Sequence, residues 1–186
     1  MKISFKTAGL GLAVMLLTTG CGYSTPKYSM SIENAKKFKQ VSQKSTTKIN
    51  VGQFQSSGQD GFIMCRVAGT INTPNGKSYS EFIKDAIDAE LTISDLQDTS
   101  GLVLSADLKK IELASNPINA YWDIQMMFDV NGEKFEVGNM YNFNAAFNAE
   151  EACNQSANAF QDAVQGVVSS LASHPTFIKA MTNTKK

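Results

Sequence analysis

Apolar and polar residues alternate with a period of two over residues 102–143, and this is the clearest pattern in the chain. The alternation predicts three β-strands, over residues 102–113, 122–130 and 135–143. Asn131-Gly132, between the last two strands, is the preferred dipeptide of a tight hairpin. The alternation slips by one residue at Lys109-Lys110, which predicts a β-bulge. Because the alternation is otherwise strict, we expect one face of this sheet to be buried and the other exposed.

Two further strands are predicted earlier in the chain. Ile49 and Val51 alternate with polar residues and Phe54 follows, which is typical of a first strand. A glycine-rich turn over residues 57–61 separates it from a second strand, predicted over residues 63–71.

Apolar residues recur at helical spacing in two places. Ser78 and Glu81 have the spacing of a capping box, which starts a helix predicted over residues 80–95. Asn148 is the expected N-cap of a longer helix near the end of the chain, and His174-Pro175 ends that helix.

The order of these elements is β-β-α-β-β-β-α, which indicates an α+β fold. We expect a two-layer sandwich in which a mainly antiparallel sheet carries two helices on one face. Residues 47–186 are long enough to form a single domain with its own core. Residues 22–46 are rich in Ser, Thr, Lys and Gln, and with Cys21 they are expected to form a flexible, solvated tether over residues 21–46.

The N-terminus has the pattern of a secretory signal over residues 1–20. Lys2 and Lys6 precede an apolar run that is too short to span a bilayer. Thr18-Thr19-Gly20-Cys21 follows, and it resembles the lipobox of bacterial lipoproteins, with Thr18 standing where that pattern prefers Leu.

Resemblance to bacterial lipoproteins implies that the signal is removed before Cys21 and that Cys21 carries palmitate and further acyl chains, which anchor the protein to a membrane. Gly22, rather than Asp, follows the cysteine. By similarity to the sorting rules of enteric bacteria, this implies the periplasmic face of the outer membrane in a Gram-negative envelope. An ordinary signal peptide with a chance cysteine is the alternative.

Two cysteines remain once Cys21 is set aside. Cys65 shares strand parity with Ile63, and Cys153 lies in the first turn of the last helix, so both are expected in the layer between helix and sheet. In an oxidising compartment this predicts a disulfide, whose loop of nearly 90 residues would contribute on the order of 4 kcal/mol in a loop-entropy model. Two separate buried thiols are the alternative.

Composition excludes several classes of function. The 186-residue chain has 17 basic and 17 acidic residues, and this balance argues against binding to nucleic acid. Three Cys and one His are too few for a zinc cluster or a haem motif, so we expect no cofactor and no metal. A hydrophobic content of 42% excludes a disordered chain.

The sequence contains no G-x-S-x-G, Walker A, G-x-G-x-x-G or H-E-x-x-H motif, and we expect no catalytic residues and no enzymatic activity. Asp129-Val130-Asn131-Gly132 resembles the start of a calcium loop, but without the required spacing it is better interpreted as a hairpin turn. Asp85, Asp88 and Glu90 are expected to lie mostly on the solvated side of their helix rather than to pair for glycoside hydrolysis. His174 is expected at a helix end, without a catalytic partner.

The end of the chain resembles a known family. Residues 162–168 lead into Pro175-Thr176-Phe177-Ile178-Lys179, which is similar to the amphipathic last helix and closing Phe-Ile of the YajG-type small outer-membrane lipoproteins. The lipobox and the order of elements are also similar to that family, and more loosely to ABC-type transport auxiliary lipoproteins. Both resemblances imply a two-layer domain, and neither supplies catalytic residues.

Two functional hypotheses follow. The first is a non-enzymatic accessory protein in envelope assembly or transport, which acts by contact with another envelope protein. Met127 and Gln125 lie on the expected exposed face of the sheet, and Met127 is a candidate apolar contact for that partner. The alternative is a carrier that binds lipid or another apolar small molecule between helices and sheet, where aromatic residues are abundant. A large cavity would favour the carrier, and a filled layer would argue against it.

Overall fold

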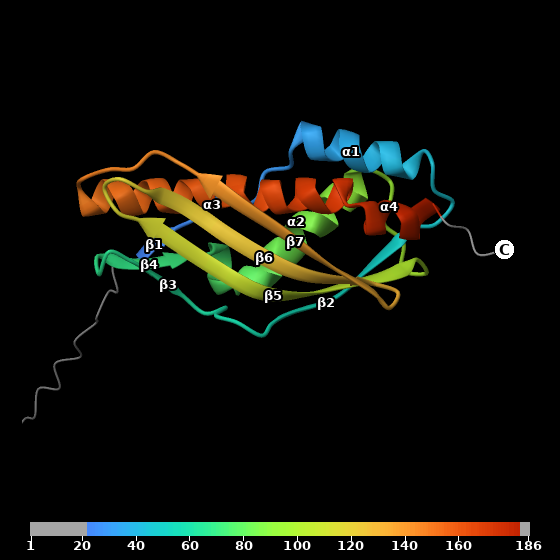
Figure 1. The fold of residues 1–186 in the computed structure, drawn as a ribbon, viewed down its shortest axis with the longest axis horizontal. Coiled ribbons are helices and arrows are strands. Elements are labelled where there is room, and N and C mark those ends of the chain that lie inside the picture. Colours follow the sequence, from blue (N-terminus) through green and yellow to red (C-terminus); the bar gives the residue numbers. More distant parts are fainter. Residues whose placement is uncertain (1–21, 183–186) are drawn as a thin grey trace, which may run out of the picture.

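The computed structural model describes residues 22–182, so the predicted signal over residues 1–20 and the lipidation candidate Cys21 lie outside the described residues. The described chain forms a four-stranded sheet with helices on one face, and the predicted α+β fold class is confirmed (Figure 1). A second sheet of three short strands extends one end of the molecule (Figure 1).

The four-stranded sheet has the order β2-β5-β6-β7. Its strands are β2 (Ile49–Ser56), β5 (Leu102–Ser115), β6 (Ala120–Val130) and β7 (Glu133–Asn142). β2 is parallel to β5, whereas the other neighbours are antiparallel. The predicted bulge is confirmed by a register shift between Leu108 and Lys110. The predicted hairpin is confirmed as well, since Asn131 and Gly132 turn the chain with φ of 52° and 92°.

Helices cover the inner face of this sheet. They are α2 (Tyr79–Ile93), α3 (Ala149–Ser173) and the short α4 (Pro175–Thr182). The capping box of Ser78 and Glu81 is formed as predicted. Asn148 caps α3 by accepting hydrogen bonds from the backbone amides of Glu150 and Glu151, at 2.8 and 3.2 Å. His174 ends α3, and Pro175 begins the next helix, where its missing N–H costs no hydrogen bond.

Aromatic side chains fill the layer between helices and sheet. Trp122, Tyr79, Phe82 and Phe160 are each at most 4% exposed. The ring centroids of Trp122 and Phe160 are 5.0 Å apart, and that of Phe160 lies 5.3 Å from those of Tyr79 and Phe82. The Trp122 indole N–H donates a 2.8 Å hydrogen bond to the carbonyl of Ser156, so its one polar group is satisfied within the core.

The prediction of a single strand over residues 63–71 is wrong, because this segment is a hairpin. Its strands are β3 (Ile63–Cys65) and β4 (Gly69–Asn72), and the 3-10 turn Pro74–Gly76 follows. Arg66 and Val67 have φ of 48° and 58°, and two successive left-handed residues reverse the chain. Neither residue is a Gly or an Asn, so the sequence does not indicate the turn.

The prediction of a flexible tether is also wrong, because residues 22–46 are folded against the rest of the domain. β1 (Gly22–Ser24) pairs in parallel with β4, which completes a small sheet of order β1-β4-β3. α1 (Ile32–Ser42) packs on α3 (Figure 1). Phe38 and Val41 point inward, at 0% and 6% exposure. The domain therefore includes the segment that the sequence assigned to a linker.

Glu90 of α2 holds the chain just before α1. The expectation that it is solvated is wrong, since its side chain is completely buried. Its Oε1 accepts hydrogen bonds from the Tyr28 hydroxyl at 2.9 Å and from the Ser31 backbone N–H at 2.7 Å. Burial, together with the neighbouring Glu90 carboxylate, raises the pKa of Tyr28 far above its usual value, so the hydroxyl keeps its proton and remains a donor.

Candidate partner-binding face

The face of the four-stranded sheet that points away from the helices is open. Gln125 and Met127 on β6 reach this face, where Gln125 is exposed and Met127 is partly buried. Met126, between them, points into the core and is 1% exposed. The structure therefore places both predicted partner-contact residues side by side on one exposed surface, which we call the open face.

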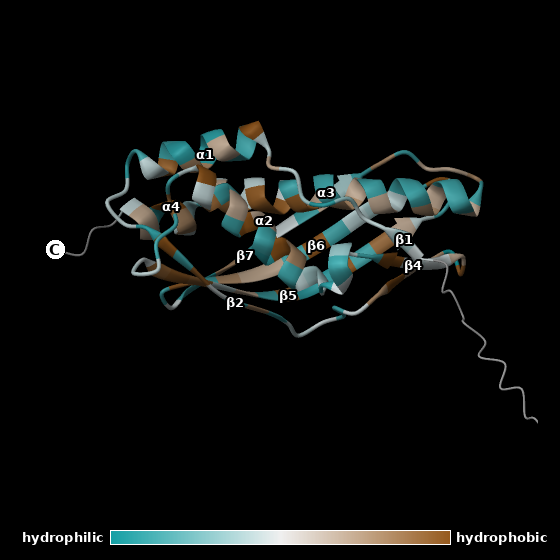
Figure 2. Ribbon diagram, turned by 180° about the vertical axis from the view of Figure 1, so that it is seen from behind, coloured by the Kyte–Doolittle hydropathy of each residue, from teal (hydrophilic) through white to brown (hydrophobic). Residues whose placement is uncertain are grey.

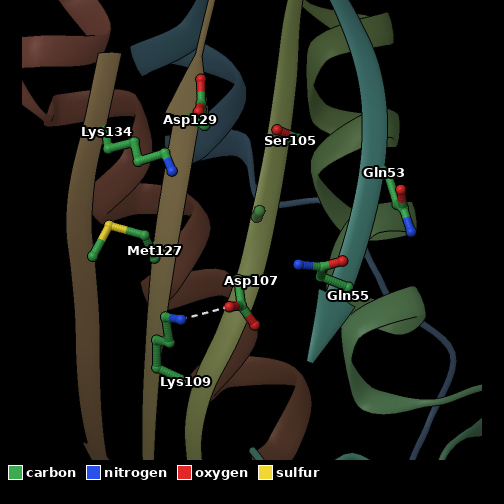
Figure 3. A pocket seen from close by; sticks show the side chains of 9 residues that line it. Gln53, Gln55, Ser105, Asp107, Lys109, Met127, Asp129 and Lys134 are labelled. Carbon is green, nitrogen blue, oxygen red and sulfur yellow. Dashed lines mark hydrogen bonds and ion pairs between the residues drawn. The ribbon is translucent and has the colours of Figure 1, made fainter. Parts of the chain in front are cut away.

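Met127 lies in a shallow hollow of about 270 Å³ lined by side chains from all four strands (Figure 3). The other lining residues are mostly polar: Gln53, Gln55, Ser105, Ala106, Asp107, Lys109, Asp129 and Lys134. Lys109 and Asp107 form an ion pair at 2.5 Å across one side of the hollow (Figure 3). The hollow therefore offers one large apolar side chain, that of Met127, within a mostly polar rim.

Neighbouring groups keep the Asp107 carboxyl group ionised. Burial acts to raise the pKa of its carboxyl group, but hydrogen bonds from Lys109 and Ser57 outweigh burial and hold the pKa below its usual value. The Ser57 backbone N–H donates to Asp107 at 2.7 Å. Asp107 is therefore a fixed negative charge at neutral pH rather than a proton donor or acceptor.

Gln125 borders a second hollow of about 370 Å³, which extends over β7 to Met140. Beside it, the Lys110 ammonium lies 2.6 Å from the Asp123 carboxylate and 2.7 Å from that of Glu112. Hydrogen bonds to Asp123 and Glu112 raise the pKa of Lys110, and the contact with Lys110 lowers that of Glu112. These charges are satisfied within the open face before any partner binds.

Acidic groups outnumber basic groups on this face. Its lysines are Lys109, Lys110 and Lys134, and its acidic residues are Asp107, Glu112, Asp123, Asp129 and Glu136. Such a surface favours a partner with hydrogen-bond donors or basic side chains, because like charges disfavour an acidic one.

The edge of the sheet offers a second kind of contact. Among the described strands, β7 pairs only with β6, so the outer edge of Glu133–Asn142 has backbone groups without a strand partner. An extended segment of another protein can add to such an edge. This edge adjoins the hollow beside Gln125, because Gly138 and Met140 of β7 line that hollow.

The predicted disulfide is confirmed. Cys65 and Cys153 are joined, with their Cα atoms 5.8 Å apart, and the bridge links β3 of the small sheet to the N-terminal part of α3. It closes a separation of 88 residues. Both residues are fully buried, so the bridge is a structural link between two parts of the fold.

His174 and Asp129, the other residues considered as candidates, contact neighbouring parts of the fold. His174 stacks on Phe135, with ring centroids 4.4 Å apart, and its Nδ1 accepts the Thr176 backbone N–H. Asp129 accepts the Gly132 backbone N–H at 2.7 Å and so stabilises the hairpin turn. Within residues 22–182, no group of three or more His, Cys, Asp or Glu side chains is placed to hold a metal ion.

Sequence reasoning missed an apolar groove between α1 and the end of α2. It has a volume of about 470 Å³, and its apolar lining includes Met30, Ile32, Ala35 and Ile93. Ile32 is 77% exposed and Ile93 is 56% exposed. The groove could not be found from the sequence once residues 22–46 were assigned to a tether.

No protein-family model matches this chain, and no curated protein has significant sequence similarity to it. None of the helices over residues 22–182 is long and apolar enough to cross a membrane.

Proposed function

We propose that this protein is a lipid-anchored, non-enzymatic accessory protein of the periplasmic face of the outer membrane, which contacts another envelope protein through the open face. The observation that carries the proposal is the one-sided sheet: helices cover one face, and the other presents Met127 and Gln125 beside a free strand edge. A protein partner fits this surface better than a small molecule does, because the hollows on it are shallow and polar.

The lipid anchor is the second part of the proposal. The lipobox-like sequence ending at Cys21 supports it. The resemblance to YajG-type lipoproteins supports the same class, and the following Gly22 supports the outer membrane.

The filled layer between the helices and the sheet argues against the carrier alternative. The layer between α3 and the sheet, where its ligand would bind, is occupied by Trp122, Phe160, Tyr79 and Phe82. Native mass spectrometry would reveal a retained lipid and so revive this alternative.

Photo-crosslinking in living cells tests the partner contact. A photoreactive amino acid is placed at Gln125 or at Met127, and a matched control is placed at Asn154 on the exposed side of α3. We expect one envelope protein to be captured from both positions on the open face and not from Asn154. Met127→Glu should weaken the capture from Gln125. Capture of the same proteins from all three positions, or no specific capture, would contradict the proposal.

Metabolic labelling with an alkyne analogue of palmitate tests the anchor. The wild-type chain should incorporate the label and fractionate with the outer membrane, whereas Cys21→Ser should do neither. An unlabelled wild-type protein in the periplasmic fraction would establish the ordinary signal peptide instead.

A further inference from the structure

The chain enters the folded domain at one end of the molecule. β1 starts at Gly22, and its parallel register places Gly22 beside Thr70 at the start of β4. The β3–β4 turn, which contains Arg66 and Val67, comes directly before β4 at this same end (Figure 1). Cys21 immediately precedes β1, and one Cα–Cα step is about 3.8 Å, so an acyl group on Cys21 would attach the domain here without an intervening linker.

Three loops at this end carry large apolar side chains that are exposed to solvent. Val67 in the β3–β4 turn is 93% exposed, Ile118 in the β5–β6 turn is 86% exposed, and Phe147 in the loop before α3 is 89% exposed. Turns and loops usually carry polar residues at such positions. We call these three residues the apolar tips. Figure 2 shows the hydrophobic colour of the turn beside β4, at the end where β1 also lies.

Arg66 fixes the three loops relative to one another. Its guanidinium donates hydrogen bonds to the backbone carbonyls of Ser115, Ala146 and Phe147, the last two at 2.7 and 3.1 Å. The disulfide from the neighbouring Cys65 adds a covalent link to α3. The apolar tips are therefore parts of one rigid end rather than three independent loops.

The β5–β6 turn is also fixed internally. The side-chain oxygen of Asn116 accepts the backbone N–H groups of Ile118 and Asn119, at 3.0 and 2.7 Å. The turn thus holds Ile118 outward at a defined position. Because the turn keeps the Ile118 side chain exposed, this end has a permanent apolar surface. Such a surface favours contact with an apolar partner.

We propose that the end bearing the apolar tips rests on the phospholipid bilayer, with Val67, Ile118 and Phe147 in the interfacial region, so that the protein is seated directly on the membrane that its lipid enters. This inference rests on the lipid anchor of the proposed function. The occupant is a bilayer because the segment that leads to the anchor enters the domain at this same end, where Gly22 lies beside Thr70, and because apolar side chains at one end of a domain insert into the acyl boundary of a membrane.

The charged residues at this end indicate which lipid headgroups it would contact. The Arg66 guanidinium is engaged with three carbonyl groups, and Glu150 and Glu151 lie exposed in the first turn of α3. This end has no basic cluster within the described residues that would select anionic headgroups. We therefore expect contact with zwitterionic lipid, with little dependence on salt, because apolar insertion is not screened.

The consequence is a fixed orientation of the domain. The long axes of β5 and β6 extend from the end that carries the apolar tips toward the opposite end, so the open face stands beside the membrane rather than on it (Figure 1). Gln125 and Met127 would then face sideways into the periplasm, where another membrane-attached protein can reach them.

Tryptophan fluorescence tests the bilayer contact. Phe147→Trp and Ile118→Trp report on the proposed contact, and Thr99→Trp, exposed before the other end of β5, is the matched control. The native Trp122 is completely buried, so the wild-type chain supplies the background signal. Each full-length chain is purified from membranes and reconstituted into phosphatidylcholine vesicles whose acyl chains carry bromine as a quencher.

A second preparation separates this inference from the lipid anchor. The chain from Cys21 onward is coupled through the Cys21 thiol to a maleimide-bearing phospholipid in the same vesicles. If the cell-derived chain does not enter membranes but the coupled chain is quenched, the proposed lipidation fails and the bilayer contact stands.

We expect brominated lipid to quench the added tryptophan of Phe147→Trp and of Ile118→Trp severalfold more than that of the Thr99→Trp control, at both low and high salt, in the coupled chain. Equal quenching of the three reporters, or none at positions 118 and 147, would overturn the bilayer contact. If a photoreactive amino acid at position 147 crosslinks two copies and the tryptophan at this position is not quenched, the bilayer contact is overturned too, and this end is assigned to a second copy of the chain.

Discussion

Two regions of this protein reach the same folded state by different means. The β5–β6 hairpin alternates apolar and polar residues along most of its length, apart from the bulge at Lys109-Lys110, and its inner face is part of the continuous core. In the N-terminal segment, residues 22–46, the buried residues are Thr25, Asn34, Phe38 and Val41. A polar segment can therefore be part of a domain when a few of its side chains pack against, or form hydrogen bonds with, residues that are distant in the sequence.

Those partners lie on the helices near the end of the chain. Phe38 packs edge-on against Phe177, with ring centroids 5.9 Å apart. The Asn34 side chain donates to the Gln165 carbonyl at 2.9 Å, and the Lys37 ammonium lies 2.6 Å from the Ser169 hydroxyl. The segment therefore joins the common core through few side chains, Phe38 and Val41, and is otherwise attached by strand pairing and single polar contacts, whereas the hairpin lines that core along its length.

The largest effect is expected at the centre of that shared core. Trp122→Ala should lower the free energy of unfolding by about 5 kcal/mol, because it leaves a large cavity beside Phe160 and removes the hydrogen bond from the indole to the Ser156 carbonyl. Urea denaturation would measure the loss. Tyr121→Ala, on the open face of the same strand, is the control and should cost less than about 1 kcal/mol. Equal losses for the two variants would contradict the assignment of the buried face.

Removing the bridge between the small sheet and α3 should have the next largest effect. The double variant Cys65→Ser, Cys153→Ser should lose about 4 kcal/mol, because the unfolded chain is no longer closed into a loop of 88 residues. The comparison of urea transitions with and without reductant checks this. Reductant should shift the transition of the wild type to that of the double variant and leave the double variant unchanged. A wild-type transition insensitive to reductant would mean that the bridge is absent.

Phe38→Ala should cost about 3 kcal/mol, less than the change at Trp122, because α1 can detach while the layer of helices and sheet remains folded. Limited proteolysis should then cut within residues 22–46 while the remainder resists. Lys39→Ala, an exposed position one residue away, should leave the segment resistant. Cooperative unfolding of the whole chain in Phe38→Ala would show that α1 is as integral as the hairpin.

Glu90→Ala should cost about 2 kcal/mol, because it leaves the Tyr28 hydroxyl and the Ser31 N–H without their acceptor. Glu90→Gln keeps an acceptor oxygen and should cost less. Denaturation measures the two losses, and proteolysis of residues 22–46 localises them. Equal losses for Gln and Ala would mean that the carboxylate charge, rather than the acceptor oxygen, holds the segment.

Local signals in the sequence were sufficient for the late strands and for the helix ends. Asn131-Gly132, Lys109-Lys110 and the capping pair of Ser78 and Glu81 each act on residues within a few positions, and the structure confirms all three. The bridge of Cys65 and Cys153 could also be predicted, because strand parity and helical position put both side chains in one layer.

The other features depend on contacts that no local pattern contains. Glu90 is buried because Tyr28 and Ser31, about sixty residues away, donate to it. The turn at Arg66 and Val67 is left-handed without Gly, and Arg66 is tied to carbonyls at Ser115, Ala146 and Phe147. For the candidate site, alternation placed Met127 and Gln125 on the exposed face, but the hollows around them are built by side chains from three or four strands and could not be predicted.

Hydrogen exchange of the backbone amides, followed by mass spectrometry, tests most directly whether residues 22–46 are part of the domain. We expect amides in Ile32–Ser42 to exchange many-fold more slowly than those of an unstructured peptide, though faster than those in the centre of β6. Glu90→Ala should speed exchange in α1 and leave β6 unchanged. Exchange of the whole N-terminal segment at the rate of an unstructured chain, beside a protected β6, would show that the segment is a free tether and would remove the direct seating of the domain on the membrane.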